Sequence, residues 1–159
     1  MILESCQMLS NAFHSSEVPD AAPYRALMTK HPCSKWTLES RDNYEWLVIH
    51  TKEIINQYHV RFNKVHACEA VLDKCIKHID SFKFPKSYLT NFVQVMPLIY
   101  RGPDVVTAYR SYIKDAKAFA KWEKGVNKPE WLQNHRVIYN EDGIESYKKR
   151  GIPLPLSLT

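Results

Sequence analysis

The sequence is poor in glycine and lacks the phosphate-binding and nucleophile motifs that depend on it. Four glycines occur in 159 residues. There is no GxxxxGK[S/T] phosphate loop, no GxGxxG turn and no GxSxG elbow. Each of these motifs needs glycine where the backbone turns sharply or closely approaches a ligand. Their absence excludes nucleotide hydrolases and serine hydrolases of the common types.

Long apolar runs, a signal peptide and CxxC pairs are also missing. The four cysteines are widely spaced, and Cys68 and Cys75 would lie two turns apart on one helix. That separation is about 10 Å, which is too long for a disulfide. We therefore expect four reduced thiols, buried or half-buried, in a cytosolic protein that does not enter a membrane.

What is present is the composition of a globular, basic protein. Hydrophobic residues make up 45% of the chain and aromatic residues 12%, and the net charge is +5. The pI near 9.0 favours nucleic acid or another anionic partner. The length fits one domain with one core. We predict a mainly α, compact single-domain fold, with a helical domain over 1–132 and a C-terminal extension over 133–159 that packs on it or trails from it.

Apolar periodicity places five helices. The clearest spans 41–63, where apolar residues recur at helical spacing over more than five turns and Ser40 can cap the start. Further helices are expected over 1–14, from Pro32 onward, over 64–80 and over 104–124, the last capped by Asp104. The first has no capping residue before it, which predicts that upstream residues are missing. The stretch 81–103 is predicted to be a long ordered loop, and the C-terminal end an extended tail.

The helix over 104–124 has a basic ridge. Cations recur there at steps of four, three, four and three, at Arg110, Lys114, Lys117, Lys121 and Lys124. Like charges at this spacing repel each other by a few tenths of a kcal/mol per pair, so an anion against the ridge would stabilise the helix. Trp122 lies among these cations and could stack on an unpaired base. A nucleic-acid contact and a solvated face are equally compatible with the pattern.

Other candidates lie in the first half of the chain. Arg61, Lys64 and His66 meet where two helices join, and Arg41 begins the longer helix. Such a cluster can clamp a phosphate, or it can be ordinary surface charge. Glu4 is the carboxylate of the first helix, and it is either a rim residue or an acid/base catalyst.

Two His-x-Cys steps, at His31 and His66, offer zinc-type ligands at a spacing that does not suit zinc. In a helix, residues i and i+2 point about 200° apart, so both side chains could not face one ion. No metal and no cofactor are expected.

Several segments together resemble a family of small tailed-phage proteins, most of them functionally unassigned. The segments are ILESCQMLSNAF, HPCSKW, NYEWL, RFNKVH, AYRSYIKDAKAFAKW and PEWL, and the resemblance spans most of residues 1–132. In that family a short segment precedes the counterpart of Met1. The resemblance implies a protein that acts in the cytoplasm of an infected bacterial host.

A more distant resemblance links the chain to pyrimidine-dimer DNA glycosylases of the phage endonuclease V type. It depends on the order of a carboxylate-bearing first helix, His-Pro with an aromatic residue, and a long helix ending in Arg and Lys. The resemblance implies an all-α fold, DNA as partner, and Glu4 as the assisting carboxylate. The attacking N-terminal amine of those enzymes does not carry over. We therefore hypothesise a DNA-processing protein related to base-excision glycosylases, or a non-catalytic phage accessory factor that binds nucleic acid or a host protein.

Overall fold

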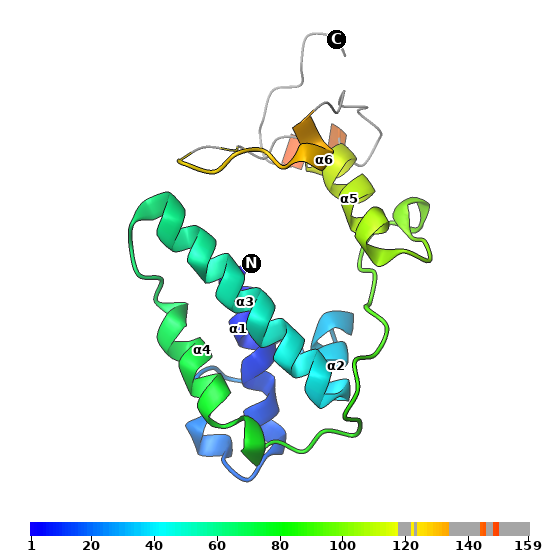
Figure 1. Ribbon diagram of the computed structural model, residues 1–159. Coiled ribbons are helices and arrows are strands. Elements are labelled where there is room, and N and C mark those ends of the chain that lie inside the picture. The colour runs from blue at the N-terminus through cyan, green and yellow to red at the C-terminus, as the bar shows by residue number, and fades with distance from the viewer. Residues whose placement is uncertain (118–121, 123, 134–143, 146–147, 150–159) are drawn as a thin grey trace. The chain divides into compact units, whose positions relative to one another are not determined.

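The computed structural model describes residues 1–117, 122, 124–133, 144–145 and 148–149. Its described residues are mainly helical, as predicted, and contain no strand apart from an isolated parallel bridge between Ser40 and Lys86. The chain divides into two compact units, Met1–Val93 and Gln94–Thr159 (Figure 1). The predicted boundary at residue 132 falls inside the second unit, and most of the predicted extension 133–159 lies outside the described residues.

The first unit is built around one long helix, α3. The other helices of the unit, α1, α2 and α4, pack against it (Figure 1). The α-helices of this unit are α1 (Ile2–Ser10), α2 (Pro32–Glu39), α3 (Arg41–Phe62) and α4 (Cys68–Lys77). Short 3-10 turns follow α1 at Asn11–Ser15, precede α2 at Pro19–Ala21 and follow α4 at Ile79–Ser81.

The core of this unit lies where α1, α3 and α4 meet. It contains the fully buried side chains of Leu9, Phe13 and Tyr44, and the Tyr44 hydroxyl donates to the Leu9 carbonyl at 3.3 Å. Three thiols are buried with them, at Cys6, Cys68 and Cys75, while Cys33 is half-buried. All four cysteines are free, as predicted, and burial raises the pKa of Cys6 to about 12 and that of Cys75 to about 11.

Side chains and a left-handed residue set the ends of α3. The Ser40 hydroxyl accepts from the Asn43 N–H at 3.1 Å, which confirms the predicted N-cap. At the other end Asn63 has φ of 47°, and its N–H donates to the His59 carbonyl at 2.8 Å. Asparagine tolerates this conformation better than most residues, so α3 ends there.

The second unit contains the short turn Leu98–Tyr100, α5 (Val105–Ala116) and α6 (Glu130–Gln133). The Asp104 carboxylate caps α5 by accepting from the N–H groups of Val106 and Thr107. α5 is shorter than the predicted helix over 104–124, because Lys117 has left the helical conformation and 118–121 lie outside the described residues. Met96, Tyr100 and Ala108 form a small core against Tyr109 and Tyr112.

Within the described ranges, no helix combines the length and the apolar character that crossing a membrane requires.

Candidate nucleic-acid interface

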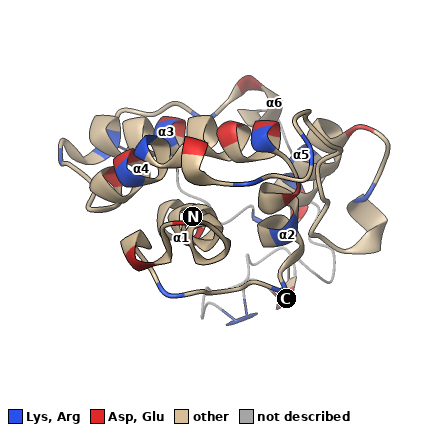
Figure 2. Ribbon diagram, turned by 90° about the horizontal axis from the view of Figure 1, so that it is seen from below, with Lys and Arg blue, Asp and Glu red and all other residues tan. Residues whose placement is uncertain are grey.

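The predicted site residues are distributed over both units. Glu4, Arg41, Arg61, Lys64 and His66 belong to the first unit, and Arg110, Lys114, Lys117 and Trp122 belong to the second. Lys121 lies outside the described residues. Acidic and basic positions are interspersed along α3 and α4 (Figure 2), so a basic surface in the first unit is a local feature of a few side chains.

Glu4 lies in the first turn of α1 and faces solvent. Its side chain is 62% exposed, and its carboxylate lies 3.5 Å from the Met1 amine. Glu4 lines neither of the two hollows described below. A carboxylate in this position is solvated, as expected of a residue at the edge of the apolar face of the helix.

Arg41 is engaged by two carboxylates. Its Nε lies 2.8 Å from Glu45 Oε1, and its Nη2 lies 2.7 Å from Asp80 Oδ1. These contacts connect the start of α3 to the turn after α4. At about 1.5 Å per residue, Arg41 also lies about 30 Å from Arg61 at the other end of α3. The structure therefore separates Arg41 from the other predicted phosphate ligands of this unit.

Arg61, Lys64 and His66 lie within six residues of the chain, at the link between α3 and α4. We call residues 61–67 the α3–α4 turn. The Tyr58 ring holds this turn in place through contacts with the rings of Phe62 and His66, at centroid distances of 4.7 and 4.8 Å. Lys64 is exposed, and no carboxylate of the described residues pairs with it. The nearby Glu69 carboxylate lies 3.4 Å from His59 Nε2.

The matched His-x-Cys steps make the same local hydrogen bond at two helix starts: His31 is the N-cap of α2, and His66 lies one residue before Ala67, the N-cap of α4. His31 Nδ1 accepts from the Cys33 N–H at 3.2 Å, and His66 Nδ1 accepts from the Cys68 N–H at 3.1 Å. An Nδ1 that accepts requires a neutral ring with its proton on Nε2. Each histidine thereby satisfies an N–H at the start of α2 or α4 that has no partner within the helix. Among the described residues, no three His, Cys, Asp or Glu side chains are grouped to hold a metal ion.

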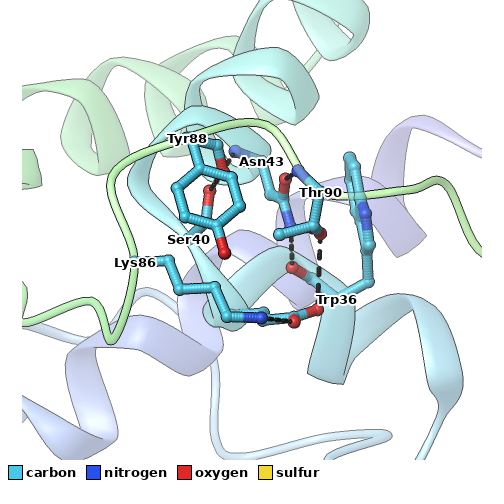
Figure 3. Close-up of polar contacts among 7 residues, drawn as sticks. Trp36, Ser40, Asn43, Lys86, Tyr88 and Thr90 are labelled. Carbon is cyan, nitrogen blue, oxygen red and sulfur yellow. Dashed lines mark hydrogen bonds and ion pairs between the residues drawn. The ribbon is translucent and has the colours of Figure 1, made fainter.

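A buried polar network at the junction of α2 and α3 was not predicted from the sequence (Figure 3). At its centre is Asn43, which is fully buried. Its amide donates to the Trp36 carbonyl and to Thr90 Oγ1, both at 2.7 Å, and its Oδ1 accepts from the Thr90 N–H at 2.9 Å. Ser40 extends the network by donating to the Tyr88 carbonyl at 2.6 Å. The network fixes residues 86–90 across the start of α3.

An ion pair completes this network on its solvent side. Lys86 Nζ pairs with the Glu39 carboxylate, and Thr90 Oγ1 donates to the same carboxylate at 3.3 Å. The hydrogen bond from Lys86 holds the pKa of Glu39 below its usual value. The Lys86 carbonyl accepts from the Arg41 N–H at 3.0 Å, which forms the isolated bridge.

Two open hollows lie on either side of Pro85, which lines both. The larger, of about 620 Å³, is lined mainly by apolar surface from Pro32, Trp36, Leu38 and Val93, with Lys30 and Lys35 at its rim. The smaller, of about 470 Å³, contains Arg41 and Lys86, whose charges are paired as described above. Neither hollow includes a residue of the α3–α4 turn.

In the second unit the cations of α5 lie close to aromatic rings. The Arg110 guanidinium lies 5.4 Å from the Trp131 ring, and Lys117 Nζ lies 5.5 Å from the Tyr112 ring. Arg110 is exposed, whereas Lys114 and Lys117 are half-buried. Stacking of this kind holds a cation in place while leaving its charge able to attract an anion.

Comparison of the chain with protein-family models, with curated proteins and with solved structures gave no match.

Proposed function

We propose that the protein is a phage DNA-processing factor that binds DNA through the α3–α4 turn, in the cytoplasm of an infected bacterial host. The observation that carries this proposal is the grouping of Arg61, Lys64 and His66 on one short, well-supported turn, with Lys64 unpaired by any described carboxylate. The positive charges of Arg61 and Lys64, with the neutral His66 ring as a hydrogen-bond donor, would contact phosphates without selecting a sequence.

The geometry of the turn supports a phosphate contact in two ways. His66 Nδ1 accepts from the Cys68 N–H, so its Nε2–H remains a donor on the same turn as Lys64. Arg61 is half-buried and its Nε is buried, so it adds a positive charge beside Lys64. The α5 cations Arg110, Lys114 and Lys117 provide a second basic set in the other unit.

Salt dependence of DNA binding tests the proposal. Each phosphate neutralised by the protein adds about 0.9 to the slope of log Kobs against log salt for duplex DNA. Lys64→Ala should weaken binding to unrelated sequences alike and lower the slope by about 1. Lys77→Ala is the matched control, because Lys77 is exposed at the opposite end of α4. If Lys64→Ala and Lys77→Ala behave alike, the α3–α4 turn is not the contact.

A second candidate function is DNA glycosylase/lyase chemistry. It is favoured by the position of Glu4 in the first turn of α1, the element in which the distant resemblance locates the assisting glutamate. The test incubates the protein with duplexes that carry ultraviolet dimers or abasic sites, in the presence of borohydride. A trapped adduct that is lost in Glu4→Gln supports the chemistry, whereas DNA binding without an adduct or nicking supports a non-catalytic factor.

A further inference from the structure

The α3–α4 turn exposes apolar side chains beside its cations. Val65 is 77% exposed, and Val60 and Phe62 on the last turn of α3 are 62% and 40% exposed. Large apolar side chains are exposed elsewhere in this unit as well, for example Ile49 at 63% and Tyr88 at 60%. Val65 differs from them in lying on a turn directly beside Lys64, which pairs with no carboxylate of the described residues. The turn therefore offers apolar contacts in addition to the cations that would contact phosphates.

The backbone around Val65 is held firmly. Asn63 N–H donates to the His59 carbonyl at 2.8 Å, and on the other side of Val65 the Glu69 N–H donates to the His66 carbonyl at 2.9 Å. The His66 ring also accepts from the Cys68 N–H and contacts the Tyr58 ring. Presenting Val65 on a preorganised turn reduces the entropy lost when it binds.

The charges beside Val65 indicate what it contacts. Lys64 and Arg61 favour a polyanion such as DNA. Some DNA-binding proteins insert an apolar side chain between base steps while cations contact the flanking phosphates. A membrane surface fits less well, because interfacial binding scales with buried apolar area and three side chains offer little. We infer that Val65, supported by Phe62, is a wedge that enters between stacked bases of the bound duplex. This inference rests on the proposed function.

Fluorescence of 2-aminopurine in duplex DNA tests the wedge, because this base brightens when it is unstacked. The wild type should raise the emission of a duplex carrying the probe. Val65→Thr keeps the shape of the side chain but replaces one methyl group with a hydroxyl, so it should abolish the rise and weaken binding by about tenfold, the scale expected for burying one Val. At 77% exposure the substitution leaves the core intact. Val95→Thr, at an exposed valine of the other unit, should change neither signal.

Three outcomes separate the wedge from DNA binding itself. If Lys64→Ala weakens binding but still brightens the probe at saturation, the cations grip and Val65 inserts, as inferred. If Val65→Thr binds and brightens like the wild type, the wedge is wrong and the proposed function stands. If the wild type does not bind DNA, the proposed function and the inference are both overturned.

Discussion

Asn43 should be the polar side chain on which the first unit depends most. It is fully buried and makes three hydrogen bonds, to the Trp36 carbonyl, the Thr90 hydroxyl and the Thr90 N–H. Asn43→Ala leaves the Trp36 carbonyl and the Thr90 N–H without these partners. An unsatisfied buried group costs about 1–3 kcal/mol, and water can partly solvate the half-buried Thr90. We expect a loss of about 2–4 kcal/mol in the free energy of unfolding.

Urea unfolding followed by tryptophan fluorescence measures this loss, since Trp36 and Trp46 lie beside the network. The control is Asn56→Ala on the same helix, where the amide is exposed and its contact with Glu53 is 3.4 Å. That change should stay within about 0.5 kcal/mol of the wild type. A loss below about 1 kcal/mol for Asn43→Ala would refute the account of this junction.

Asn43→Asp gives an independent check on the same hydrogen bonds. It keeps the acceptor for the Thr90 N–H but turns an oxygen toward the Trp36 carbonyl. Burial beside that carbonyl should raise the pKa of the introduced carboxyl above its unfolded value of about 3.9. The variant should therefore be markedly unstable at pH 7 and recover as the pH falls toward about 4. A loss in the free energy of unfolding that does not change with pH would contradict the donor and acceptor roles assigned to the Asn43 amide.

The remaining predictions concern the caps, the thiols and the ion pair. His31→Ala should cost about 1 kcal/mol in urea unfolding while His31→Asn costs less, because asparagine is also a helix cap; equal losses would argue against the cap. In the native protein a thiol reagent should modify half-buried Cys33 first, and it should reach the buried Cys6, Cys68 and Cys75 only on unfolding. A Cys33→Ser variant that still reacts rapidly in the native state would contradict the burial of the other three thiols. Lys86 lowers the pKa of Glu39 in the folded protein. The pair therefore stabilises the fold fully above the pKa of an unfolded glutamate, about 4.3, and this stabilisation is lost as the pH falls through the lower pKa of Glu39 in the folded protein. The stability gap between wild type and Lys86→Met should shrink over that range, and a gap that persists at low pH would exclude the pair as its cause.

Helices with strong periodicity and recognisable ends could be predicted from the sequence. The helix predicted over 41–63 is observed as Arg41–Phe62, because Ser40 and Asn63 provide a cap and a left-handed end. The helix predicted over 64–80 begins only at Cys68, because residues before it form the turn in which His66 Nδ1 accepts from the Cys68 N–H. Residues after Ser10 tighten into a 3-10 turn, which apolar spacing does not distinguish from an α-helix.

The polar network could not be predicted because its partners are distant in sequence. Asn43 bonds to Thr90, a residue in a stretch with no period, and nothing local indicates that pairing. A polar residue at a buried helix position was the available signal. Arg41 was expected to bind phosphate, but a single sequence does not show that Asp80 lies beside it. The Arg61, Lys64 and His66 grouping could be predicted because the three residues are neighbours along the chain.

DNA binding through the α3–α4 turn is decided by the salt dependence of duplex binding, measured for the wild type and for Lys64→Ala. If the α3–α4 turn grips phosphates, log Kobs falls linearly with log salt, and the slope is smaller by about 1 in the variant. A wild-type affinity that does not change with salt, or a slope that Lys64→Ala leaves unaltered, would contradict it.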